Sequence, residues 1–165
     1  MQIIGIISDT HLSRITPQFV KQARTIFSPC TYIVHAGDLT EAGILDIFSD
    51  KQVIAVHGNM CSAATKQLLP ESTTFQVNHQ TIAVYHGHGG GLDIEDYLLT
   101  HFATADAIIF GHTHRPLVSR AGRTLLVNPG TFRLTGRYGS PGTYALMTSS
   151  ATGLTAAIHQ LPLSR

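Results

Sequence analysis

The chain of 165 residues has little cysteine, little charge and no tryptophan. Its two cysteines, Cys30 and Cys61, are too few for a disulfide framework, and neither belongs to a CxxC pair. The formal net charge of +1 provides no electrostatic basis for binding nucleic acid or an anionic membrane. No uncharged apolar run approaches the roughly 18 residues of a membrane span, and no leader pattern precedes the first apolar run. We therefore expect a cytoplasmic protein in a reducing environment.

Apolar residues and histidine are plentiful. Apolar residues make up 43% of the chain, which predicts a globular fold rather than disorder. The length suits one compact domain with a substantial core, so we predict a single domain over residues 1–165. The 10 histidines equal in number the aspartates and glutamates together. Because histidine is the commonest metal ligand and titrates near neutral pH, this excess suggests metal or acid–base chemistry.

The first seventy residues alternate between strand and helix patterns. Apolar runs without alternation predict strands buried on both faces, and helical spacing predicts helices between them. The strands are expected at 2–8, 32–35 and 53–56, and the helices at 17–27, about 41–49 and 63–69. Thr16 and Pro17 form a typical helix start, with Thr16 as N-cap. This order favours a sheet with parallel strands.

The second half predicts hairpins as well as a helix. The hairpin strands are expected at 73–77 with 81–85, 117–119 with 124–127, and 143–149 with 154–161. A helix at 92–102 precedes a further apolar strand at 107–110, and the Gly- and Arg-rich segment 128–142 reads as a loop. The whole chain therefore predicts two sheets, one mainly parallel and one mixed, with helices outside them.

Side chains suited to metal binding follow five of the expected strands. In chain order these residues are Asp9 and His11, Asp38, Asn59, His86 and His88, and His112 and His114. Because parallel strands end at the same edge of a sheet, we expect these residues to converge there. Carboxylate, amide and imidazole ligands suit first-row divalent ions, and two such ions form a hydrolytic centre.

The first three motifs, each taken alone, have a plainer explanation. Asp9, Asp38 and Asn59 could each be turn residues, and His11 could lie on the surface. A pair of histidines that flank one residue at the end of an apolar strand is harder to explain by packing, so the two later pairs favour metal ligation. The five motifs together favour one shared metal centre.

Six segments stand in a fixed order along the chain: Ser8–His11, Gly37-Asp38, Gly58-Asn59, His86–His88, Gly111–His114 and Asn128–Thr131. In this order they resemble the motifs of the calcineurin-like metallophosphoesterases, and especially the small, cap-less prokaryotic YfcE-like phosphodiesterases. The resemblance implies an α/β fold, a four-layer α/β/β/α sandwich of two mixed β-sheets flanked by helices.

The resemblance also implies a centre of two divalent ions. One ion would be held by Asp9, His11, Asp38 and His114, and the other by Asp38, Asn59, His86 and His112, with Asp38 bridging. A hydroxide bridging the ions would attack a small phosphodiester or phosphomonoester substrate. Mn²⁺ is the expected metal, and the same ligands admit Fe, Ni, Co or Zn. Relatives commonly associate, which leaves a homodimer or a homotetramer open.

The chain departs from the family's motifs directly after Asn59. Many relatives have a histidine there, taken to protonate the leaving group, and then an acid, whereas this chain has Met60 and Cys61. We therefore assign catalytic roles to Asn59 and His86 and consider His88 a candidate phosphate contact or replacement acid, with a solvated loop histidine as the alternative. Cys61 is expected to replace the carboxylate without binding metal.

Two arginines of the predicted loop, Arg133 and Arg137, could bind a substrate phosphate, or could instead be solvated or join a subunit contact. The first hypothesis for function is a metal-dependent phosphoesterase. The alternative is a non-catalytic metal-binding interaction scaffold, the role that a retromer subunit with this fold illustrates. The complete set of seven ligands favours the enzyme, whereas Met60 and Cys61 favour the scaffold. A nuclease for long DNA is disfavoured by the near-neutral charge.

Overall fold

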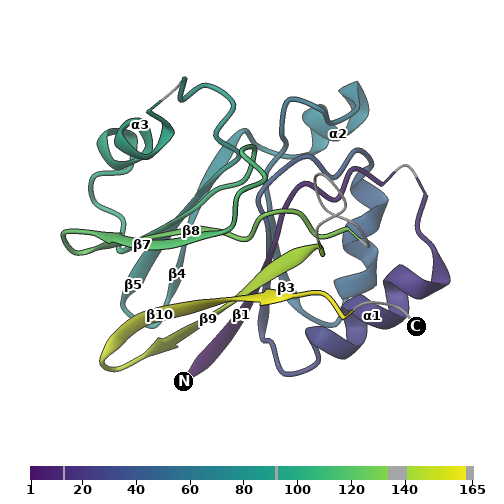
Figure 1. Cartoon of the computed structure of the whole chain (residues 1–165), viewed down its shortest axis with the longest axis horizontal. Helices are drawn as coiled ribbons and strands as arrows, with labels where there is room; N and C mark the ends of the chain where they lie inside the picture. The colour runs from purple at the N-terminus through teal and green to yellow at the C-terminus, as the bar shows by residue number, and fades with distance from the viewer. Residues whose placement is uncertain (13, 92, 134–140, 163–165) are drawn as a thin grey trace.

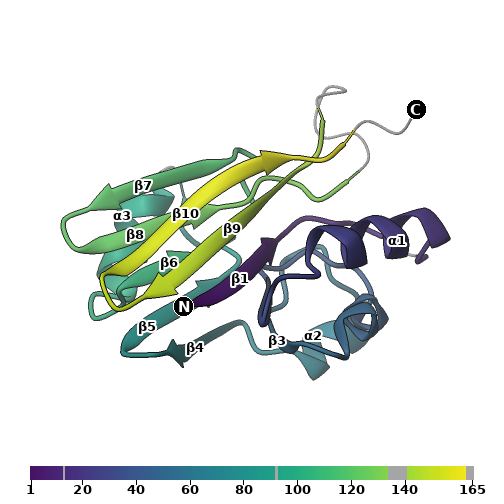
Figure 2. The ribbon, with the colours of Figure 1, turned by 90° about the horizontal axis from the view of Figure 1, so that it is seen from below.

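The computed structural model describes residues 1–12, 14–91, 93–133 and 141–162 and contains two five-stranded sheets packed face to face (Figure 1, Figure 2). The first sheet has the order β10 (Gly153–Gln160), β9 (Thr143–Ser150), β1 (Gln2–Ile7), β2 (Tyr32–His35) and β3 (Gln52–Ala55). Its three N-terminal strands are parallel, and β9 pairs with β1 in the antiparallel direction.

The second sheet has the order β4 (Ser72–Val77), β5 (Gln80–Tyr85), β6 (Ala107–Ile109), β8 (Thr124–Asn128) and β7 (Leu117–Ala121). Strands β5, β6 and β8 run parallel, and the strands at both edges are antiparallel to their neighbours. Both sheets are therefore mixed. The sequence analysis expected one mainly parallel sheet, and this was wrong. The hairpin of β9 and β10 adds two strands to the first sheet through antiparallel pairing.

Among the described residues, four helical segments lie outside the sheets: α1 (Pro17–Ile26), η1 (Ala42–Phe48), α2 (Ala63–Leu68) and α3 (Ile94–His101). The Thr16 side chain accepts a hydrogen bond from the Phe19 N–H, which confirms it as the N-cap of α1. The predicted helix at 41–49 is a 3₁₀ helix, η1, without a side-chain cap. Its buried Ile44 and Ile47 are three residues apart, the spacing that places side chains on one face of a 3₁₀ helix. None of the described helices is long and apolar enough to cross a membrane.

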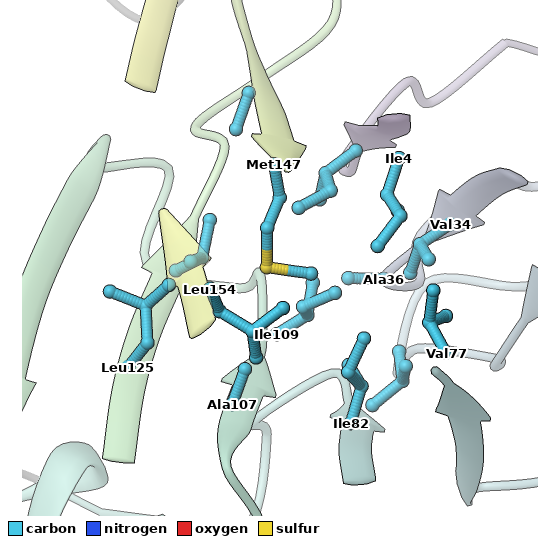
Figure 3. Close-up of a cluster of buried hydrophobic side chains, with 14 of the residues drawn as sticks. Ile4, Val34, Ala36, Val77, Ile82, Ala107, Ile109, Leu125, Met147 and Leu154 are labelled. Carbon is cyan, nitrogen blue, oxygen red and sulfur yellow. The ribbon is translucent and has the colours of Figure 1, made fainter. Parts of the chain in front are cut away.

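In the part of the chain that the structure describes, three apolar clusters hold the layers together. The central cluster lies between the sheets and combines, for example, Ile4 and Met147 of the first sheet with Ile82 and Ile109 of the second (Figure 3). A second cluster packs α1 and η1 against the first sheet, and a third packs α3 against the second. The layers follow the order helix, sheet, sheet, helix, which confirms the four-layer sandwich.

Candidate metal centre

The polar residues that follow the parallel strands lie at the edges of both sheets, not of one sheet as the sequence analysis expected. Asp9, Asp38 and Asn59 follow β1, β2 and β3 of the first sheet, whereas the histidine pairs follow β5 and β6 of the second. The edges meet where the Nδ1–H of His86 donates to the Ala36 carbonyl oxygen at 2.8 Å. The packing of one sheet on the other therefore assembles the site.

One group of possible ligands consists of Asp9, His11 and His114. The Nε2 atom of His114 lies 3.0 Å from Oδ1 of Asp9, and Nε2 of His11 lies 3.7 Å from the same oxygen. The two Nε2 atoms are 3.5 Å apart. Asp9 is buried and both histidines are partly exposed, so this group opens to solvent.

The other group consists of Asp9, Asp38 and His86, all of them buried. The Nε2 atom of His86 lies 3.2 Å from Oδ2 of Asp38 and 4.0 Å from Oδ1 of Asp9. The same Oδ2 atom of Asp38 is 3.9 Å from Nε2 of His11. Both carboxylates therefore lie between the two groups, which is an arrangement suited to two neighbouring divalent ions.

In both Asp9 and Asp38, one carboxylate oxygen accepts hydrogen bonds from neighbouring protein groups and the other faces the centre. Oδ2 of Asp9 accepts hydrogen bonds from the Ser8 hydroxyl at 2.5 Å and from the His112 N–H at 3.1 Å. Oδ1 of Asp38 accepts from the Met60 N–H at 2.8 Å. The second oxygen of each residue, Oδ1 of Asp9 and Oδ2 of Asp38, is the one that faces the histidines.

Two glycines allow these side chains to approach the backbone. A Cβ atom on Gly37 would lie 2.5 Å from Nδ1 of His86, and a Cβ atom on Gly58 would collide with Oδ1 of Asp38. Gly37 also has a φ of 95°, which glycine adopts without steric cost. The glycines of the Gly-Asp and Gly-Asn motifs therefore make room for the centre.

Five of the predicted ligands have left-handed backbone conformations although none is glycine. Their φ angles are 53° at Asp9, 46° at His11, 54° at Asp38, 65° at His112 and 59° at His114. Asp and His are among the residues enriched in this region, yet each still pays about 1–2 kcal/mol relative to the right-handed conformation. Strained residues of this kind concentrate at functional sites.

Electrostatic interactions set the ionisation of the centre. Burial lowers the pKa of His11 and of His112 below the ordinary value, so both favour the neutral form that binds metals. Burial also lowers the pKa of His86, but contact with Asp38 and the charge of Asp9 raise it overall. For Asp38, burial raises the pKa, but the contact with His86, the Met60 N–H and the charge of His11 together lower it overall, so the carboxyl is ionised at neutral pH.

Two buried atoms of the centre have no hydrogen-bond partner among the described residues: Oδ1 of Asp9 and Nε2 of His86. An unpartnered buried polar atom costs about 1–3 kcal/mol. Oδ1 of Asp9 offers a lone pair, and Nε2 of His86 offers one when the ring is neutral, because the remaining proton is then on Nδ1 and bonded to Ala36. A divalent cation would partner both atoms, so the residues present fit a metal.

Asn59 and His112 lie at the exposed rim of the centre. The His112 ring packs edge-on against the His86 ring, with centroids 5.2 Å apart. The Asn59 carbonyl oxygen of the backbone accepts a hydrogen bond from Nζ of Lys66 at 2.8 Å, which holds this loop against α2. Neither residue belongs to the two close groups, so their ligation stays a prediction.

His88 is half-buried beside the centre, and its ring centroid lies 5.8 Å from that of His86. Its Nε2 atom faces Oε1 of Glu71 at 3.6 Å, and burial lowers its pKa. The sequence analysis did not identify Glu71. Nothing in the residues around it indicates a contact with His88, which lies in the loop after β5. The sequence analysis also gave Asn128 no role, although its amide donates to the Gly111 carbonyl at 2.8 Å and so holds the histidine loop.

The two residues that depart from the family motif differ in exposure. Sγ of Cys61 accepts a hydrogen bond from the Gly58 N–H at 3.3 Å, and this buried thiol belongs to neither group of possible ligands in the described part of the chain. The Met60 side chain is 60% exposed. Arg133 is exposed, and its charge adds to burial in lowering the pKa of His11. Arg137 lies outside the described residues.

Residues 1–152 match the family model of the calcineurin-like phosphoesterase superfamily domain. A probable metallophosphoesterase of Methanocaldococcus jannaschii is 36% identical over 133 residues, or 78% of this chain and 67% of that protein. Phosphodiesterase YfcE of Escherichia coli K12 is 28% identical over 110 residues, or 64% of this chain and 57% of that protein. The crystal structure of Vps29 complexed with zinc from Entamoeba histolytica has a TM-score of 0.77 at 21% identity, covering 97% of this chain and 93% of that one.

Proposed function

Because the chain belongs to the calcineurin-like phosphoesterase superfamily, we propose that it hydrolyses a small phosphodiester with two divalent metal ions. The observation that carries this proposal is the pair of overlapping carboxylate–histidine groups with unpartnered lone-pair atoms at their centre. The M. jannaschii and E. coli relatives, named for phosphoesterase and phosphodiesterase activity, support the same reaction class.

We assign the two ions to the seven ligands of the sequence analysis. Asp38 is the proposed bridge, because its Oδ2 atom faces both His11 and His86. Asp9 would stand beside it, since its Oδ1 atom belongs to both groups. When bound, two divalent ions supply positive charge for the phosphoryl oxygens and lower the pKa of water.

The remaining side chains would orient the substrate. Asn59 is exposed at the rim, where its amide group can donate to a phosphate oxygen. His88, with Glu71 3.6 Å from its Nε2 atom, is the imidazole that we propose would contact the phosphate or the leaving group. Met60 has no proton to give, so the chain protonates a poor leaving group weakly.

The test is reconstitution of metal-stripped protein. Mn²⁺, Zn²⁺, Fe²⁺, Co²⁺ and Ni²⁺ are added back separately, bound metal is counted, and hydrolysis of bis-p-nitrophenyl phosphate and p-nitrophenyl phosphate is followed. We expect two equivalents of metal, activity that returns with metal, and faster cleavage of the diester with Mn²⁺. If the protein binds two equivalents of each metal and cleaves neither ester, this result would contradict the proposal that it is an enzyme.

That negative result would support the second candidate, a metal-binding scaffold. The exposed Met60, in place of the catalytic histidine of many relatives, is the observation that favours it. The oligomeric state, proposed as a homodimer or homotetramer, is measured by analytical ultracentrifugation of the same preparations. A scaffold would use its metal site for structure or partner binding without turnover.

A further inference from the structure

A cavity of about 510 Å³ adjoins the candidate metal centre between α3 and the loop that follows β6. α3 lies over the outer face of the second sheet, beside β7 and β8 (Figure 1). The cavity walls include the apolar side chains of Ile94, Phe110 and Leu117. Its volume is within the roughly 300–1,000 Å³ typical of small-molecule sites.

The cavity begins at the two histidine motifs of the centre. His112 lines it, and the His112 backbone N–H donates to Oδ2 of Asp9 at 3.1 Å. Ile94 packs so closely over Gly87 that a Cβ atom there would lie 2.5 Å from the Ile94 Cδ1 atom. Gly87 separates His86 from His88, so one wall of the cavity rests directly on the metal-site loop.

Two charged residues also line this cavity. Glu95 and Arg115 are both exposed, and they contribute one negative and one positive side chain to the lining. The Arg115 N–H donates to Oγ1 of Thr113 at 3.2 Å, and the Asn128 amide donates to the same oxygen at 3.1 Å. These bonds occupy the polar atom of Thr113 and fix the loop, and Ile94, Phe110 and Leu117 supply the apolar part of the lining.

We propose that this cavity binds the organic ester group of the substrate and that this group carries an aromatic ring. The inference rests on the proposed function, because it requires the phosphoryl group to lie at the metal centre. A substituent on that phosphoryl group then passes His112 and enters a space lined in part by the apolar side chains of Ile94 and Leu117. A flat ring buries its faces against Ile94 and Leu117, and the guanidinium of Arg115 can lie over its face.

The test compares two non-hydrolysable ligands with the same phosphonate group, phenylphosphonate and methylphosphonate. Their dissociation constants are measured by calorimetry on protein loaded with Mn²⁺. We expect phenylphosphonate to bind at least about tenfold more tightly, because only its ring buries additional apolar surface. In Glu95→Trp, the indole fills the mouth of the cavity and the ratio falls toward one.

Asp96→Trp is the matched control, because Asp96 is the next exposed residue of α3 and does not line the cavity. This variant should keep the wild-type ratio. Leu117→Asn, which makes one wall polar at similar size, should also lower the ratio and replaces the first variant if Glu95→Trp fails to fold. An equal affinity for both phosphonates in the wild-type protein, or a ratio unchanged by Glu95→Trp and Leu117→Asn, overturns the proposal.

The calorimetric result is separable from the outcome for catalysis. A protein that cleaves bis-p-nitrophenyl phosphate but does not prefer phenylphosphonate retains the proposed function and loses the aromatic subsite. A protein that cleaves neither ester but prefers phenylphosphonate in a Glu95-dependent way loses the hydrolytic function and retains the subsite as a binding site.

Discussion

Asp38 turns its two carboxylate oxygens in different directions, and a single substitution can separate their roles. Oδ1 accepts the Met60 N–H, and Oδ2 faces His11 and His86. Asp38→Asn can keep the oxygen that holds the loop and loses the charge that faces the histidines. We expect bound metal to fall at both sites and hydrolysis to fall by at least about 100-fold, because in the proposed centre the lost charge would serve both ions.

Metal analysis by mass spectrometry and the diester assay measure these losses. Asp46→Asn, at an exposed position of η1, is the control and should match the wild-type protein in both assays. Two metal equivalents and near-native turnover in Asp38→Asn would exclude Asp38 as the bridge.

His114 tests the cost of the left-handed backbone at the centre. With a φ of 59° at this residue, His114→Gly should be about 1 kcal/mol more stable than His114→Ala in metal-free protein. Urea unfolding measures the difference. His101, the last residue of α3, is the control pair, because alanine should there be more stable than glycine. If the alanine variant is more stable than the glycine variant at both positions, the left-handed conformation stores no strain.

We expect the residue at position 60 to determine how strongly the rate of the proposed hydrolysis depends on the leaving group. The Met60 backbone N–H is fixed by Asp38 at 2.8 Å whatever the side chain, so Met60→His would place an imidazole at the rim of the centre. The wild-type protein should cleave activated aryl esters far faster than alkyl esters. Met60→His should raise the alkyl rate by up to about 100-fold and change the aryl rate little, because only the alkyl group needs a proton.

A series of esters with different leaving-group pKa values measures this dependence. Met60→Leu is the control for the loss of the thioether and should behave as the wild-type protein does. A flat dependence in the wild-type protein would show that another acid acts, with His88→Ala as the next variant to measure.

At the scale of single elements, glycine has opposite roles in η1 and in the loop after β2. A Cβ atom on Gly43 of η1 would meet no heavy atom within 4 Å, whereas one on Gly37 would lie 2.5 Å from Nδ1 of His86. Gly43→Ala should therefore raise the free energy of unfolding by about 0.4–1 kcal/mol. Gly37→Ala should lower it and reduce metal content, because His86 must move. Denaturant titrations measure the free energy of unfolding of both variants. A Gly43→Ala variant less stable than the wild-type protein would contradict the expected stabilisation of η1.

The elements themselves could largely be predicted from local sequence. Apolar runs, the Thr16–Pro17 helix start and the hairpin turns act over a few residues, and the structure has strands and helices at those places. The 3₁₀ form of η1 was not predicted, because its apolar spacing also fits an α-helix. The addition of β9 to β1 was not predicted either, since this pairing joins residues about 140 positions apart.

The same division applies to the candidate site. Ligand types could be read from the ends of strands, but the split of the residues over two sheets depends on how the sheets pack. The contact between His88 and Glu71 and the left-handed φ of non-glycine residues such as Asp9 and His11 depend on tertiary structure. Local patterns carry no information about them.

At the scale of the whole molecule, the candidate ligands come from both sheets, so bound ions would cross-link the two layers. An ion present at 100 times its dissociation constant contributes about 2.7 kcal/mol, which corresponds to roughly 5–10 °C in Tm for a chain of this size. Calorimetric scans with Mn²⁺ and with a chelator measure this shift. Asp38→Asn should show a much smaller shift, and an unchanged Tm in metal-loaded wild-type protein would mean that the ions do not link the sheets.

The pairing of β9 with β1 also has a consequence for synthesis of the chain. All seven candidate ligands lie between residues 9 and 114, yet β1 has no neighbour on its outer side until residues 143–150 are made. At about 5–20 residues per second, the ribosome needs roughly 2–7 s to add the 36 residues from 114 to 150. During this interval a complete ligand set is exposed on an unfinished fold. The first ion encountered then has a kinetic advantage, so protein made in cells and protein refolded in a chosen buffer should differ in the metal they contain.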